Sequence, residues 1–128
     1  MDYLRWGVLG ASKFAFEHLT PAIQLARNNS FKALASSSKT KAAAFAQLEP
    51  EIEVFGDYNE LLEDDRIDAV YIPLPNTMHV DWTIRAIKSG KHVLCEKPIA
   101  MRAEEIDELI KLRNTTGLLV AEAYMIVH

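Results

Sequence analysis

A glutamate and a lysine stand side by side at the point where a short apolar stretch ends. Residues 93–95 are compatible with a strand, and Pro98 closes the stretch because proline cannot donate to a sheet ladder. In open α/β sheets, ligands bind just beyond the carboxyl ends of the strands, which makes Glu96 and Lys97 candidates for a binding or catalytic site. Spacing alone is equally compatible with a solvated ion pair in a loop.

A second candidate is the turn after the first predicted strand, where a dinucleotide-binding fingerprint would have three glycines. The three positions hold Gly10, Ser12 and Ala15. Alanine is accepted at the third position, whereas Ser12 either crowds the approach of a pyrophosphate or offers it a hydroxyl. The N–H groups and the positive dipole end of the following helix favour an anion, so Lys13 and Phe14 join the candidate cofactor-binding residues. Many turns with a single glycine bind nothing, and this pattern leaves both interpretations open.

The end of the second predicted strand bears on the choice of cofactor. An acidic residue there would hold the ribose 2′-OH of NAD, and a basic one would accommodate the 2′-phosphate of NADP. This sequence has Ser36, Ser37 and Ser38 followed by Lys39 and Lys41, with no acid. Hydroxyls and lysines favour NADP over NAD and make Ser36 and Ser37 candidate contacts. The alternative is that the serines simply cap the next helix.

These residues need a scaffold, and the sequence predicts one from alternating apolar runs and helical stretches. Strands are expected at residues 4–9, 31–36, 54–55, 68–74, 92–95 and 118–124, with helices between them. Pro21 should kink or split the first helix near Thr20. The alternation predicts an α/β fold, a doubly wound parallel sheet of the Rossmann type in strand order 3-2-1-4-5-6.

Local signals refine the predicted helices. Asp57 is expected as an N-cap with Glu60 reaching back in a capping box, and Asn76 as the cap of a helix that ends at Gly90. Gly90 and Lys91 mark the entry to the fifth strand. The helix over residues 103–114 is expected to turn three apolar side chains inward, namely Ile106, Leu109 and Ile110.

Composition limits the classes of function. A chain of 128 residues suits one domain, and its net charge of −4 with a pI of about 5.5 gives no basic face for nucleic acid or an anionic membrane. One cysteine, Cys95, excludes an internal disulfide and a multi-cysteine metal site, so no metal is expected. Without a signal-like apolar segment or a run long enough to span a membrane, we expect a soluble, cytoplasmic protein.

Three stretches together resemble a known family. They are residues 7–11 (Gly-Val-Leu-Gly-Ala), 69–79 (Ala-Val-Tyr-Ile-Pro-Leu-Pro-Asn-Thr-Met-His) and 86–98, which ends in Glu-Lys-Pro. In order and spacing they resemble the Gfo/Idh/MocA oxidoreductases, and the middle stretch is similar to the glucose-fructose oxidoreductase and dihydrodiol dehydrogenase branch. The resemblance covers essentially the whole chain. It implies an NAD(P)-dependent enzyme that transfers a hydride to or from a sugar, an inositol or a diol.

The resemblance also implies roles for individual residues. Lys97 would be the catalytic lysine, orienting the substrate hydroxyl and assisting proton transfer, and Glu96 would contact the nicotinamide ribose. The Lys97–Pro98 peptide would often be cis. Four further residues would line the cofactor path, namely Leu74, Pro75, Asn76 and His79. From the residues alone, a helix-cap histidine without a catalytic role is the favoured interpretation of His79.

Members of this family continue into a second domain that binds the substrate and completes the active site. The resemblance therefore divides the chain into a dinucleotide-binding domain, residues 1–123, and the start of a linker, residues 124–128, with the C-terminal substrate domain absent. Such a chain should bind cofactor and turn over little or nothing alone. Two alternatives remain open: a non-catalytic dinucleotide-binding module, and a truncated fragment without independent activity. The latter would show apolar patches near Tyr124 and self-association.

Overall fold

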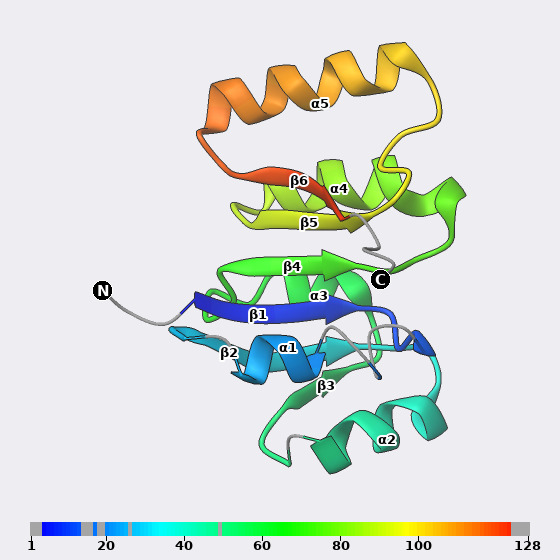
Figure 1. Ribbon diagram of the computed structural model, residues 1–128, viewed down its shortest axis with the longest axis vertical. Coiled ribbons are helices and arrows are strands. Elements are labelled where there is room, and N and C mark those ends of the chain that lie inside the picture. Colours follow the sequence, from blue (N-terminus) through cyan, green and yellow to red (C-terminus); the bar gives the residue numbers. More distant parts are fainter. Residues whose placement is uncertain (1–3, 14–16, 18–19, 26, 49, 124–128) are drawn as a thin grey trace.

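A computed structural model describes residues 4–13, 17, 20–25, 27–48 and 50–123 (Figure 1). Four of the predictions above fall outside these residues: the roles of Phe14 and of Ala15, the linker over residues 124–128 and the apolar patch near Tyr124.

The fold is built on a six-stranded sheet in the order β3-β2-β1-β4-β5-β6 (Figure 1). All five neighbouring pairs are parallel. The strands are β1 (Leu4–Leu9), β2 (Asn29–Ala35), β3 (Glu53–Phe55), β4 (Ala69–Ile72), β5 (His92–Glu96) and β6 (Val120–Ala123). The predicted doubly wound parallel sheet and its strand order are confirmed, with strand boundaries that differ by a few residues.

The helices cover both faces of the sheet, because alternate residues of each strand point to opposite sides. On one face Val8, Leu34 and Tyr71 pack with Ile23 of α1 and Phe45 of α2. The other face packs against α3, α4 and α5, whose buried contributions include Leu61, Ile87 and Leu109. The helices are α1 (Thr20–Leu25), α2 (Lys39–Leu48), α3 (Tyr58–Leu62), α4 (His79–Lys88) and α5 (Ala103–Thr116), with a short 3₁₀ turn η2 (Asn76–Met78).

Several local predictions can be compared with the structure. Within the described residues helix α1 spans Thr20–Leu25 and contains Pro21, close to the point where a kink or split is predicted. The Asp57 carboxylate caps α3 by accepting from the amide of Asn59 at 2.8 Å, as predicted. The return bond from Glu60 is not seen within the described part of the chain. The capping prediction for Asn76 is wrong, because Pro75 holds the N-cap position before η2 and makes no side-chain cap.

The predicted inner face of the last helix is wrong in part. Leu109 is buried, but Ile106 and Ile110 are 43% and 40% exposed. The reason is that α5 lies beside β6 at the edge of the sheet (Figure 1), where fewer strands are available to cover it. A hollow of about 250 Å³ remains between α5 and β6, lined by side chains that include Ile106, Ile110 and Val120. Self-association through exposed apolar surface stays a prediction.

One ion pair joins the starts of two neighbouring strands. Arg5 of β1 donates from Nε and Nη2 to the two carboxylate oxygens of Asp68, at 2.9 and 3.0 Å, and its backbone N–H donates to Oδ2 at 2.8 Å. These bonds favour the carboxylate, so the hydrogen bond from Arg5 lowers the pKa of Asp68 below 3.8. The pair fixes the register of β1 against the loop that leads into β4.

Acid should weaken the fold through this pair. Because the folded-state pKa of Asp68 is depressed, its contribution is complete above the unfolded value of 3.8 and is lost as pH falls through the folded value. We expect the free energy of unfolding from urea titrations to fall as pH drops below about 4, and to fall less in the variant Asp68→Asn. Parallel pH profiles for the two chains would contradict this assignment.

Candidate functional site

The predicted site residues gather at one edge of the sheet because all strands are parallel. Gly10 follows β1, Ser36 follows β2, the segment around Leu74 follows β4, and Glu96 ends β5. Ligands in open parallel sheets bind in the crevice outside these carboxyl ends, next to the point where the strand order reverses. Here that point lies between β1 and β4, which pair directly although they are far apart in sequence.

Gly10 occupies the centre of this edge in a conformation that favours glycine. Its φ is +109°, and its amide donates to the carbonyl of Ala35 at 2.8 Å, which joins the turn after β1 to the end of β2. A Cβ at this position would lie 3.0 Å from Cδ2 of Leu74, which is itself buried. The missing side chain therefore lets the turn after β1 and the segment after β4 approach each other.

A small hollow lies beside the glycine turn. It has a volume of about 200 Å³ and is lined by Ser12, Lys13 and Lys41 together with Ala11, Ala44 and Phe45. Lys13 is exposed and lies 3.9 Å from the Glu17 carboxylate. Two lysines and a serine thus contribute to the lining of a mostly apolar hollow, and their polar groups could bind an anionic group on a partly apolar ligand.

Two of the three serines after β2 use their hydroxyls in hydrogen bonds with the protein backbone. Ser36 is buried, and its hydroxyl accepts from the amide of Ser38 at 3.0 Å and donates to the Ser38 carbonyl at 3.1 Å. The Ser38 hydroxyl accepts from the amide of Lys41 at 3.3 Å, which makes Ser38 a cap for α2. The helix-cap interpretation thus holds for Ser38. Ser37 is exposed and lies nearer to solvent than its neighbours.

His79 is buried between two turns. Its side chain is 1% exposed, and both ring nitrogens contact backbone carbonyls: Nδ1 lies 2.6 Å from the oxygen of Pro98, and Nε2 lies 2.6 Å from that of Leu74. These contacts join the segments after β4 and β5, and the expectation that His79 lines the cofactor path stays a prediction. Pro75 and Asn76, by contrast, are exposed at this edge.

The Glu96–Pro98 turn presents one acid inward and one base outward. Lys97 is exposed and followed by a cis peptide bond to Pro98. The described chain therefore does not desolvate Lys97 by burial. Glu96 is partly buried, and burial raises the pKa of its carboxyl, whereas the Tyr71 hydroxyl and the charge of His79 lower it. The cis peptide and the position of Lys97 at the mouth of β5 agree with the sequence-based expectation.

Two buried neighbours complete the environment of Glu96. Tyr71 is fully buried on the face of the sheet that also carries Glu96, because it pairs with Leu94 two residues earlier. Its hydroxyl makes no hydrogen bond of standard geometry within the described residues, yet it is close enough to Glu96 to influence its pKa. Sequence reasoning missed Tyr71, although strand register would have placed it there. Burial raises the pKa of the Cys95 thiol to about 12, so this cysteine is no nucleophile at neutral pH.

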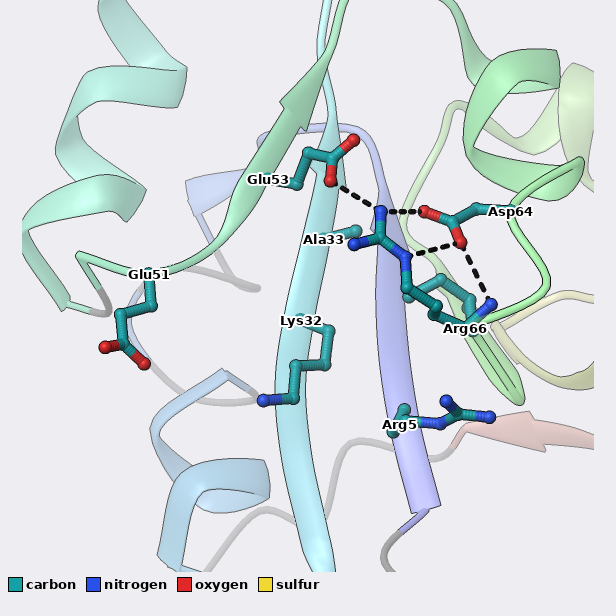
Figure 2. A pocket seen from close by; sticks show the side chains of 8 residues that line it. Arg5, Lys32, Ala33, Glu51, Glu53, Asp64 and Arg66 are labelled. Carbon is teal, nitrogen blue, oxygen red and sulfur yellow. Dashed lines mark hydrogen bonds and ion pairs between the residues drawn. The ribbon is translucent and has the colours of Figure 1, made fainter.

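A larger hollow of about 300 Å³ lies near the opposite edge of the sheet (Figure 2). It is lined by residues at or before the starts of β1, β3 and β4 together with Lys32 and Ala33 of β2, and its charges are largely matched. Figure 2 shows the Arg66 guanidinium between Glu53 and Asp64, at 2.6 Å from an oxygen of each. The hydrogen bond from Arg66 lowers the pKa of Asp64 to about 2. We assign this cluster to holding the loop before β4 against β3.

Neither a metal site nor a membrane span is found in the part of the chain that the structure describes. No group of three or more histidine, cysteine, aspartate or glutamate side chains is placed to hold a metal ion there. None of the described helices combines the length and apolarity needed to cross a bilayer.

Comparison with known proteins finds relatives that are oxidoreductases. The chain is 44% identical over 126 residues to an uncharacterized oxidoreductase, ORF334, of Rhizobium meliloti, and 43% identical over 125 residues to a dTDP-3,4-didehydro-2,6-dideoxy-alpha-D-glucose 3-reductase of Streptomyces violaceoruber. Each match covers 98% of this chain but only 38% and 36% of the relative. A crystal structure of a KijD10 variant, a 3-ketoreductase from Actinomadura kijaniata with TDP-benzene and NADP, superposes with a TM-score of 0.90 at 34% identity, over 96% of this chain and 39% of that one.

The chain thus spans less than two fifths of the length of these relatives. A family described as "Oxidoreductase family, NAD-binding Rossmann fold" (GFO_IDH_MocA) matches residues 4–124. That range includes the glycine turn, the segment after β4 and the Glu96–Pro98 turn. Sequence motifs, strand order and the family match agree, and the chain belongs to the Gfo/Idh/MocA oxidoreductase family as an NAD-binding Rossmann domain.

Proposed function

We propose that this chain is the cofactor-binding part of an NADP-dependent oxidoreductase acting on a sugar or a related polyol. The observation that carries the choice of NADP is the hollow lined by Ser12, Lys13 and Lys41, next to a β2 end without an acidic residue. A 2′-phosphate is an anion that lysines and a hydroxyl can bind, whereas the ribose 2′-OH of NAD favours a carboxylate. Ser37 supplies a further exposed hydroxyl after the end of β2.

The relatives support both halves of the proposal. KijD10 has been solved with NADP, and a relative from Haloferax volcanii, 37% identical over 122 residues, is a D-xylose 1-dehydrogenase described as using NADP⁺. The names of this D-xylose 1-dehydrogenase and of the dTDP-3,4-didehydro-2,6-dideoxy-alpha-D-glucose 3-reductase of Streptomyces violaceoruber contain a sugar and a sugar nucleotide. Because the chain covers only part of each relative, the substrate class and the activity are proposals for the protein in which this domain works.

The residues of this chain can take the following roles. A nicotinamide dinucleotide would supply the carbon that accepts or donates the hydride. Gly10 opens the turn so that backbone N–H groups approach the pyrophosphate, and Glu96 would hold the nicotinamide ribose. Lys97 reaches outward from the end of β5, where its ammonium would orient a substrate hydroxyl and exchange a proton with it. We expect the isolated chain to bind cofactor without appreciable turnover.

The choice of cofactor can be tested by titrating the chain with NADPH and with NADH, followed by calorimetry. We expect NADPH to bind more tightly, and Lys41→Ala to weaken NADPH by about tenfold, the value of one charge-assisted contact, while leaving NADH unchanged. Lys39→Ala is the matched control, since Lys39 is also exposed in the first turn of α2 but does not line the hollow.

Three outcomes separate the alternatives. Equal affinities for NADPH and NADH that Lys41→Ala leaves unchanged would contradict the NADP assignment. Binding of neither nucleotide would favour a fragment without independent function. Turnover of a sugar by the purified chain would contradict the expected dependence on further polypeptide. Tight NADPH binding without turnover supports the proposal. A non-catalytic dinucleotide-binding module would give the same result, and co-purification of the chain with a substrate-binding polypeptide would argue against such a module.

A further inference from the structure

The side chain of His79 is placed between two backbone carbonyls that can only accept hydrogen bonds. The oxygen of Pro98 lies 2.6 Å from Nδ1, and the oxygen of Leu74 lies 2.6 Å from Nε2. A neutral imidazole carries one N–H, so it can satisfy one of these carbonyls and must direct a lone pair at the other. An imidazolium carries two N–H groups and satisfies both. With the side chain 1% exposed, solvent offers little alternative.

The ionisable groups around His79 come from several elements. Glu96 at the end of β5 is an acid nearby: burial, the largest cause, raises the pKa of its carboxyl, whereas the Tyr71 hydroxyl and the charge of His79 lower it. On α4 itself, Asp81 is exposed and lies 3.4 Å from Arg85. Other ionisable groups on the neighbouring elements include His92 of β5, the exposed Lys97, the buried Cys95 and, on β6, Glu122, which accepts from the amide of Ile99 at 2.9 Å.

We propose that His79 is a buried imidazolium that positions the two turns forming the nicotinamide end of the site. One N–H holds the Leu74 carbonyl of the segment after β4, and the other holds the Pro98 carbonyl next to Lys97. His79 is thus a positioning residue, since it touches the segments that carry Glu96 and Lys97 and is itself closed off. The expected effect of His79 on cofactor binding rests on the proposed function. The proposed charge state of His79 is independent of that function.

The charge state can be measured directly on the intact chain by ¹⁵N NMR of the histidine rings at about pH 7. We expect both ring nitrogens of His79 to carry protons. His92 is an internal control, because its Nδ1 accepts from the amide of Leu119 at 3.0 Å and must be unprotonated. The variants His79→Gln and His92→Gln assign the two sets of signals among the four histidines. A neutral His79 ring in the same spectrum as a neutral His92 would overturn the proposal, whether or not any nucleotide binds.

The consequence for the site is measured by titrating the natural chain and His79→Gln with NADPH and with 2′,5′-ADP, which carries the 2′-phosphate but no nicotinamide. His79→Gln should bind NADPH about tenfold more weakly and 2′,5′-ADP as tightly as the natural chain does. If the ring is doubly protonated but His79→Gln binds NADPH as tightly as the natural chain, or loses affinity for both ligands equally, the positioning role is wrong. If neither chain binds NADPH while the ring is doubly protonated, the proposed function fails and the charge assignment stands.

Discussion

Replacing Lys91 by methionine is expected to lower the free energy of unfolding by about 2–4 kcal/mol. Lys91 is only 4% exposed, and its Nζ donates to the carbonyls of Asp64 and Ile67 at 2.8 and 2.7 Å. It thereby joins the start of β5 to the loop between α3 and β4. Methionine retains most of the apolar stem, so the variant removes the two bonds and leaves two carbonyls without donors.

The matched control for this variant is Lys88→Met. Lys88 lies at the end of α4, is exposed, and should change stability by less than about 0.5 kcal/mol. Urea denaturation monitored by tryptophan fluorescence compares the three chains, with Trp6 and Trp82 as reporters. Equal losses of stability in both variants would show that the buried bonds of Lys91 contribute nothing beyond a generic effect of charge removal.

The pH dependence gives Lys91 a second signature. Burial lowers the pKa of Lys91 below 10.5, so between the folded value and 10.5 the unfolded chain binds more protons than the folded chain. Stability of the natural chain relative to Lys91→Met should therefore rise with pH in that window. The neutral amine still carries N–H donors for both carbonyls, so the bonds survive the titration. A difference in stability that falls as pH approaches 10.5 would contradict this account.

Lys91 shows where sequence reasoning on the fold ends. The apolar runs of the six strands predict a parallel sheet because strands buried on both faces must be apolar throughout, and the order follows from right-handed crossovers. The role of Lys91 depends on carbonyls 24 and 27 residues away, which no local pattern shows. The prediction that Ile106 and Ile110 point inward was wrong for a related reason. Helical spacing shows which side chains share a face, but it does not show whether another element covers that face.

Some features of the candidate site could likewise be predicted from the sequence, and others could not. Motifs placed Gly10, Glu96 and Lys97 at one edge, and the parallel strands confirm that placement. They did not show that His79 is closed off between two carbonyls, or that Ser36 is occupied by its own backbone turn, because both depend on how loops fold back. Side-chain identity thus indicated the chemistry of the edge, and tertiary packing decided which groups remain available to a ligand.

Replacing Gly10 by alanine is expected to weaken NADPH binding by about thirtyfold and to destabilise the fold by about 2 kcal/mol. At a φ of +109° a side chain is strained, and the new Cβ would lie 3.0 Å from Cδ2 of Leu74. Backbone strain and crowding together cost about 4 kcal/mol, and the turn can recover about half of this by returning to negative φ, where its N–H groups no longer converge on the pyrophosphate. The fold loses the remaining half, and the binding conformation, about 2 kcal/mol above the relaxed one, is depopulated by about thirtyfold, so the apparent affinity falls by the same factor.

Two other glycines separate the causes of this effect. Gly117 has a φ of +74° at the end of α5, and an added Cβ there would have no neighbour within 4 Å, so Gly117→Ala reports backbone strain without crowding. Gly56 has neither a positive φ nor a neighbour within 4 Å, so Gly56→Ala reports the substitution alone. We expect Gly117→Ala to lose stability but retain NADPH affinity, and Gly56→Ala to retain both. If Gly117→Ala weakens NADPH as much as Gly10→Ala does, the loss arises from general destabilisation, and the turn after β1 is not the pyrophosphate site.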